Sequence, residues 1–170
     1  MLSKKYQSAI ETSTAFMAKM EDLVREIAIQ NSIPYYRIES QMEHHPHMNA
    51  EDVYMPVVRI ITYFEDTVSK VAEILQNEFD IIPGKSIDKK KNRLDSFSYK
   101  HIQYIGNLKA NRRELTEYKR CGDKKFEIQL CSMLQDAWSG IEKELGYDNV
   151  SFPAESKRDF YRVGALLEMA

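Results

Sequence analysis

The sequence predicts an α/β domain in which several helices pack on one β-sheet, and three observations support this fold class. Apolar residues recur at helical spacing through residues 6–30, which predicts a long amphipathic helix. Residues 57–64 form a continuous apolar and β-branched run that is typical of a central strand. Residues 125–131 alternate apolar and polar side chains, the period of a strand with one buried face. Helical and strand periods therefore follow one another within 170 residues, a length that suits one domain.

The first half of the chain is expected to hold a helix, a strand and a second helix. Asn31 and Pro34 end the first helix, because proline cannot continue a helical backbone. Asp66 is expected to cap the second helix. The apolar stripes comprise Ile10, Met17, Met20, Leu23, Val24 and Ile27 in the first helix, and Val68, Val71, Ile74, Leu75 and Phe79 in the second.

The second half is expected to supply further strands and two more helices. The Pro83-Gly84 pair marks a turn, and the polar residues 88–93 predict a loop. Residues 97–105 predict a strand that connects through a charged segment to the strand at 125–131. The expected division is an N-terminal helix at 1–32, a sheet core at 33–150 with a helix at 132–145, and a C-terminal helix at 151–170, itself spanning 156–169.

Composition limits the classes of function. The 24 basic and 26 acidic side chains give no overall attraction to nucleic acid or to a membrane surface. Cys121 and Cys131 form no metal-binding motif and no disulfide framework, so reduced thiols are expected. The sequence shows no signal peptide and no apolar run of membrane-spanning length. We therefore expect a cytoplasmic protein that does not bind membranes.

The strand at 125–131 carries the first candidate chemistry. Its three apolar side chains are expected to face the core, so that Glu127, Gln129 and Cys131 share the opposite face. A carboxylate fixed on a rigid strand is well placed to hold a metal ion or to accept a proton. A solvated strand face is the alternative interpretation of the same pattern.

The strand and the helix that follows it resemble the RelA/SpoT alarmone synthetase family. The segment KFEIQLCSMLQDAWSGIEKELGY at 125–147 is similar to that family's E-I-Q-I-R-[ST] strand and A-W-A-E-I-E-H-x-L-x-Y-K helix. Upstream, VVRIITYFED at 57–66 resembles the G-[IV]-R-I-I-x-Y-F-E-D segment. The stretch FSYKHIQYI at 97–105 resembles the G-Y-x-S-L-H loop. The resemblance covers most of the chain from residue 33 onward.

This resemblance implies a nucleotidyltransferase-like fold with a mixed sheet, and a reaction that transfers pyrophosphate from ATP to the ribose 3′-hydroxyl of GTP or GDP. Such a transfer depends on positioning and charge neutralisation, and it uses Mg²⁺. By resemblance, the catalytic residues are Glu127 and Arg59, with Glu127 also contacting the metal. The resemblance also implies nucleotide binding by Tyr99, Gln129 and Glu142, and Lys89, Lys91 and Arg93 are expected to add a cationic loop just before Tyr99 that takes part in this binding.

The chain departs from the family pattern where the chemistry lies. Tyr54 stands at the position of the metal-binding aspartate in D-x-x-G-x-R, and a phenol is a poor Mg²⁺ ligand at neutral pH. Asp52 would replace that aspartate only after a register shift. Gln41 and Glu43 stand at the phosphate-binding arginine and lysine of S-R-x-K, so that the local charge is reversed. The remaining departures are Val57, Ser98, Gln103, Cys131, Gly140 and Lys143.

These departures predict a RelA/SpoT-type domain whose pyrophosphate transfer is weak or lost, with residual guanine-nucleotide binding through Tyr99. Mg²⁺ is the expected cofactor if the enzyme is active, and none otherwise. One alternative is an active synthetase, or a relative that modifies tRNA, with Asp52 and Glu127 holding Mg²⁺. Another is a non-catalytic interaction module that assembles as a homo-oligomer. His44, His45 and His47 are interpreted as part of an exposed loop in preference to a metal site.

Overall fold

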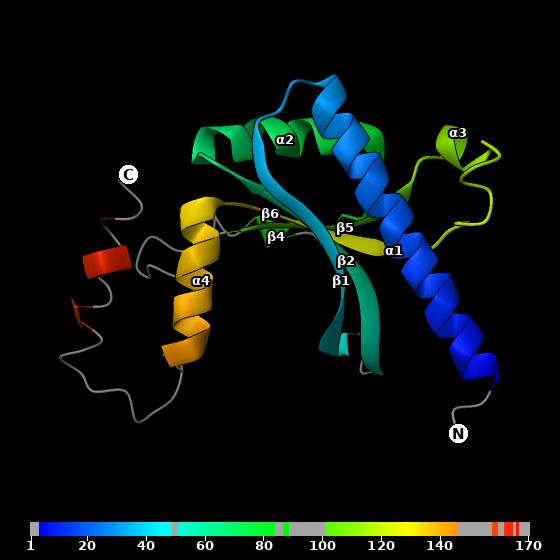
Figure 1. Ribbon diagram of the computed structural model, residues 1–170, viewed down its shortest axis with the longest axis horizontal. Helices are drawn as coiled ribbons and strands as arrows, with labels where there is room; N and C mark the ends of the chain where they lie inside the picture. Colours follow the sequence, from blue (N-terminus) through cyan, green and yellow to red (C-terminus); the bar gives the residue numbers. More distant parts are fainter. Residues whose placement is uncertain are drawn as a thin grey trace.

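The chain forms a mixed α/β structure, as the sequence predicted (Figure 1). The computed structural model describes residues 4–48, 51–83, 87–88, 101–145, 158–159, 162–164 and 166. Among the described residues, no helix has the length and apolar character needed to cross a membrane. The elements are α1 (Lys4–Gln30), β1 (Tyr35–Met48), β2 (Glu51–Thr62), α2 (Glu65–Glu78), β3 (Phe79–Ile81), β4 (Ile87–Asp88), β5 (Ile102–Leu108), α3 (Ala110–Arg113), β6 (Phe126–Ser132) and α4 (Met133–Leu145).

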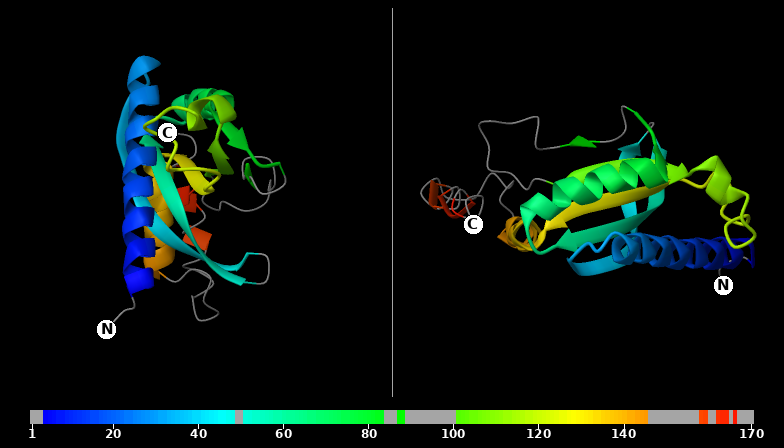
Figure 2. Two further views of the ribbon diagram at one scale, coloured as in Figure 1. Left: turned by 90° about the vertical axis from the view of Figure 1, so that its right-hand side faces the viewer. Right: turned by 90° about the horizontal axis from the view of Figure 1, so that it is seen from above.

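The sheet runs in the order β1-β2-β6-β5-β3, with β4 paired to β5. The β2–β6 pair is parallel and the other pairs are antiparallel, which makes the sheet mixed. Strand β2 pairs with β6 from Val57 onward. The first half of β2 therefore extends, together with β1, beyond the end of β6. Figure 2 shows this β1–β2 hairpin projecting past the rest of the sheet.

One face of the sheet buries the main apolar core. The apolar residues of β6 lie on this face and pack with the predicted α1 residues Met20, Leu23, Val24 and Ile27 and the predicted α2 residues Val68, Val71 and Leu75. Phe79, predicted as part of the second helix, instead begins β3, where it is buried in the same core. Phe126 makes edge-to-face contacts with Phe16 and with Phe79, at centroid distances of 6.0 and 5.3 Å. Burying a side chain of this size contributes about 2–3 kcal/mol. The opposite face carries Glu127 and Gln129 and is contacted by α4.

The strand β1 is an element that the sequence analysis did not predict. The expected loop at His44, His45 and His47 is wrong, because this stretch belongs to β1. His44 pairs with Tyr54 and His45 with Val53, so the hairpin partner supplies the ladder that local sequence did not indicate. The ladder shifts register between His45 and Met48, around Pro46, where a missing backbone N–H costs no hydrogen bond.

Several predicted boundaries also change. Asp66 does not cap α2: the cap residue is Phe64, without a side-chain hydrogen bond, and Glu65 and Asp66 lie inside the first turn. There their charge interacts favourably with the helix dipole. The strand predicted at 97–105 is β5, which continues to Leu108, while residues 97–100 lie outside the described part of the chain. Of the predicted loop at 88–93, Asp88 belongs to β4 and the rest lies outside the described residues.

Candidate functional site

The candidate site lies on the polar face of β6, where two strands flank the strand that carries Glu127. In the sheet register, Glu127 lies opposite Val57 on β2 and Ile105 on β5. Gln129 lies opposite Arg59 and Gln103 one pleat further along. The Glu127 side chain is fully buried, in contrast to the solvated face that was the alternative interpretation.

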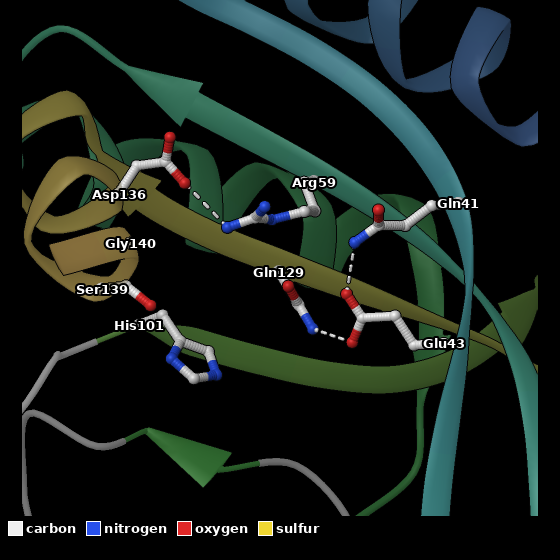
Figure 3. A pocket seen from close by; sticks show the side chains of 8 residues that line it. All are labelled: Gln41, Glu43, Arg59, His101, Gln129, Asp136, Ser139 and Gly140. Atoms are coloured by element: carbon white, nitrogen blue, oxygen red, sulfur yellow. Dashed lines mark hydrogen bonds and ion pairs between the residues drawn. The ribbon is translucent and has the colours of Figure 1, made fainter. Parts of the chain in front are cut away.

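A pocket of about 530 Å³ opens on this face (Figure 3). Strands β1, β2 and β6 supply one wall, and the first two turns of α4 supply another. Its described lining residues are Gln41, Glu43, Arg59, His101, Gln129, Asp136, Ser139 and Gly140.

The amide of Gln129 bridges the carboxylates of Glu127 and Glu43. Its Nε2 donates to Glu127 Oε1 at 2.7 Å and to Glu43 Oε2 at 3.0 Å. The other oxygen of Glu43 accepts a hydrogen bond from Gln41 Nε2 at 2.6 Å. Glu43 is therefore held between two amides, and Gln129 links it to the carboxylate of Glu127.

Arg59 lies on the pocket wall and is engaged by carboxylates. Its Nη2 donates to Asp136 Oδ1 at 2.8 Å, and its Nη1 lies 3.8 Å from Glu39 Oε1. Arg37 contacts the same two carboxylates, with Nε 3.3 Å from Glu39 Oε2 and Nη2 3.4 Å from Asp136 Oδ2. The resulting set of four charges connects β1, β2 and α4.

The start of α4 is fixed by a reciprocal cap that places Asp136. Ser132 N donates to Gln135 Oε1 at 2.9 Å, and Gln135 N donates to Ser132 Oγ at 3.3 Å. This is a capping box, in which each side chain satisfies the other residue's backbone N–H. The helix therefore begins at Met133, and Asp136 falls in the first turn, facing Arg59.

The structure brings together some of the site residues that the sequence analysis predicted. Glu127, Gln129 and Arg59 lie on neighbouring positions of β6 and β2. Asp52 lies on β2 five residues before Val57, the partner of Glu127, which separates the two backbones by roughly 16 Å along the strand. Four other predicted residues, Lys89, Lys91, Arg93 and Tyr99, lie outside the described part of the chain. For Asp52 and Glu142 the structure describes the backbone only.

Asp136, Ser139 and His101 line the pocket but were missed by the sequence analysis. For Asp136 a signal was present, because the Ser132-x-x-Gln135 pattern marks a helix start and places Asp136 in the first turn. No local pattern indicates its partner, since Arg59 lies 77 residues earlier in the chain.

The residues present do not fit the metal site that the resemblance implies. Tyr54, at the position of the expected aspartate, is 66% exposed and lies three residues before the partner of Glu127. One oxygen of Glu127 already accepts a hydrogen bond from Gln129. Within the described ranges, no group of three or more His, Cys, Asp or Glu side chains is arranged to hold a metal ion.

Comparison with known proteins agrees with this fold. The fold is that of the small alarmone synthetases, and residues 31–151 match the family model described as the region found in RelA / SpoT proteins. The chain belongs to the RelA/SpoT family. No curated protein matches it.

Solved structures of small alarmone synthetases align over nearly the whole chain. Small alarmone synthetase 2 from Bacillus subtilis has a TM-score of 0.71 and 16% identity, covering 98% of this chain and 94% of the other. Small alarmone synthetase 1 from the same organism, bound to its product pppGpp, has a TM-score of 0.69 and 15% identity, covering 98% and 93%. The same protein bound to AMPCPP has a TM-score of 0.59 and 14% identity, covering 98% and 92%. At these identities the likeness establishes the fold.

Proposed function

We propose that this chain is a RelA/SpoT-type synthetase domain in which ATP-to-GTP or ATP-to-GDP pyrophosphate transfer is weak or lost, while guanine-nucleotide binding remains. The observation that carries the proposal is the position of Gln41 and Glu43, which line the same pocket as Arg59 and Gln129. By resemblance these two positions belong to an arginine and a lysine that bind phosphate. The charge at the two positions therefore changes from +2 to −1.

The direct contacts of Glu43 strengthen this argument. Its two carboxylate oxygens are held by Gln41 and Gln129, so the side chain is fixed inside the pocket. Two unit charges about 4 Å apart interact by about 4 kcal/mol at an effective dielectric constant of 20. A triphosphate placed beside a fixed carboxylate is repelled on this scale, whereas a lysine there would attract it. ATP binding is therefore weakened at the position where the pyrophosphate donor would lie.

The carboxylate pair expected for Mg²⁺ is also incomplete. When bound, Mg²⁺ would neutralise charge on the transferred phosphates. Glu127 keeps its place on β6, but Tyr54 offers a neutral phenol where the resemblance implies an aspartate. Arg59 keeps its place on β2, yet its guanidinium already contacts Asp136 and Glu39. These residues support a site that retains its framework and has lost much of its capacity for the transfer.

Guanine-nucleotide binding is proposed on separate grounds. Tyr99 matches the tyrosine that, by resemblance, stacks on the guanine of the acceptor. A structurally similar synthetase has been solved with its guanine-containing product pppGpp. Stacking of a base on an aromatic ring contributes about 1–3 kcal/mol and requires no metal. The acceptor side can therefore persist when the donor side is lost.

Isothermal titration calorimetry with GTP, GDP and a non-hydrolysable ATP analogue tests the proposal, each with and without Mg²⁺. We expect guanine-nucleotide binding that is insensitive to Mg²⁺ and no measurable binding of the ATP analogue. Tyr99→Ala should abolish the guanine-nucleotide signal, while Tyr63→Ala, a change at an exposed tyrosine, should leave it intact. Mg²⁺-dependent binding of the ATP analogue would show that the donor site works and would refute the proposal.

A further inference from the structure

The four charged side chains around Arg59 form a closed ring. Going round it, Arg59 Nη2 contacts Asp136 Oδ1 at 2.8 Å, and Asp136 Oδ2 contacts Arg37 Nη2 at 3.4 Å. Arg37 Nε contacts Glu39 Oε2 at 3.3 Å, and Glu39 Oε1 lies 3.8 Å from Arg59 Nη1. Two positive and two negative charges therefore alternate, and their formal sum is zero.

Asp136 makes the shortest contact in this ring. Its contact with Arg59 is a charge-assisted hydrogen bond, which is roughly twice as strong as a neutral one. Both side chains are about four-fifths buried, with exposed fractions of 20% for Arg59 and 21% for Asp136, so water screens the pair less than it would at the surface. Because the capping box fixes the first turn of α4, the Asp136 carboxylate is held in place beside the guanidinium.

Asp136 and Arg59 both line the pocket. An anion entering it meets a guanidinium whose Nη2 and Nη1 already face the carboxylates of Asp136 and Glu39. To bind Arg59, a phosphate must displace Asp136 or share the guanidinium with it. Among the described lining residues, Arg59 is the one cationic side chain that is always charged. The negative charge of Asp136 therefore opposes phosphate binding at Arg59.

We propose that Asp136 determines the phosphate affinity of this pocket by competing with the ligand for Arg59. The inference rests on the proposed function only for the class of ligand, a phosphate-bearing nucleotide. In this role Asp136 weakens phosphate binding. A residue that orients Arg59 for the ligand would strengthen it. The two roles predict changes of opposite sign when the carboxylate loses its charge.

The test is calorimetric titration of inorganic tripolyphosphate into the wild-type protein and into Asp136→Asn at low ionic strength. Asparagine keeps the size of aspartate and removes its charge. We expect the affinity for tripolyphosphate to rise about tenfold, which corresponds to the loss of one competing charge-assisted contact. An unchanged or lower affinity, or no detectable binding by Asp136→Asn, would overturn the inference.

Matched variants separate competition at Arg59 from a general change in charge. Asp159→Asn makes the same substitution in an exposed ion pair with Arg162 and is expected to change the affinity less than twofold. The double variant Asp136→Asn/Arg59→Gln is expected to lose the gain. A gain that Asp159→Asn reproduces, or that survives in the double variant, would contradict the inference.

If Asp136→Asn does not fold, as judged by thermal unfolding, Glu39→Gln carries the test. Its carboxylate lies further from Arg59, so we expect a smaller gain of about two- to threefold in the same direction. No gain in this variant would then overturn the inference. The outcome is distinguishable from failure of the proposed function, because this inference fails on the change in tripolyphosphate affinity between the wild-type protein and the variants, whereas that proposal fails on Mg²⁺-dependent binding of the ATP analogue by the wild-type protein.

Discussion

Glu43 is the residue on which the proposed loss of ATP binding rests. Its carboxylate lies between the amides of Gln41 and Gln129, on the side of the pocket formed by β1. Restoring positive charge there by Gln41→Arg/Glu43→Lys should raise the affinity for a non-hydrolysable ATP analogue at least about tenfold, because a repulsive contact becomes an attractive one. Calorimetric titration measures the change.

The control for that variant carries the same change in net charge away from the pocket. Gln30→Arg/Glu26→Lys alters two exposed residues of α1 and should leave the affinity within about twofold of the wild type, since salt screens distant surface charges. Equal gains in both double variants would mean that net charge is responsible. No gain in either double variant would mean that Gln41 and Glu43 do not cause the proposed weak binding of ATP.

The sequence identified part of the site at the residue scale. Glu127 and Gln129 were predicted because a strand period and a family motif coincide on them, whereas Arg59 was predicted from the family motif alone. The contact between Asp136 and Arg59 was not predictable, because it joins a helix turn to a strand 77 residues earlier. The direction in which Glu43 points also depends on the β1–β2 register, which local sequence does not encode.

The C-terminus of helix α1 shows how a helix end is fixed. Ile33 N donates to Ala28 O at 2.9 Å and Ser32 N donates to Ile29 O at 3.0 Å, the two bonds of a Schellman motif. Ser32 has φ 53°, a left-handed conformation that glycine adopts at lower cost.

Ser32→Gly should therefore stabilise the protein by about 0.5–1 kcal/mol. Urea denaturation measures the change in the free energy of unfolding. Ser32→Ala is the matched control and should give no gain, because alanine removes the hydroxyl but keeps the Cβ atom. A loss of stability in Ser32→Gly would show that the hydroxyl matters more than the backbone conformation.

Two glycines give a second test at this scale. A Cβ atom at Gly106 on β5 would lie 2.7 Å from the backbone oxygen of Asp80 on β3, so Gly106→Ala forces these strands apart. We expect a loss of about 1–3 kcal/mol in the free energy of unfolding. Gly140→Ala on α4 meets no atom within 4 Å and should gain about 0.5–1 kcal/mol from helix propensity. Similar effects of both changes on the denaturation midpoint would contradict the packing described.

The elements that the sequence predicted well are those with a strong apolar period. Strand β6 and helices α1 and α2 each bury one apolar face in the core. Strand β1 was missed although Arg37, Glu39, Gln41 and Glu43 alternate with Ile38, Ser40 and Met42, because Ser40 interrupts the apolar face and Pro46 lies within the strand. Its conformation comes from pairing with β2, a tertiary contact that overrides weak local preference.

For the whole molecule, the core and the pocket are built from separate sets of residues. The main apolar cluster contains none of the described residues that line the pocket. Substitutions in the pocket can therefore change charge and metal ligation while the RelA/SpoT fold is kept. This separation explains how a chain with 14–16% identity to solved small alarmone synthetases retains their architecture while its pocket residues depart from the family pattern.

The most direct measurement is a pyrophosphate-transfer assay with the purified chain. Labelled ATP is incubated with GTP or GDP and Mg²⁺, and the 3′-pyrophosphorylated product is separated by chromatography. We expect product at or near the level of a Glu127→Gln variant, because the donor side of the pocket is proposed to repel ATP. Robust Mg²⁺-dependent product formation by the wild-type chain, abolished in Glu127→Gln, would contradict it.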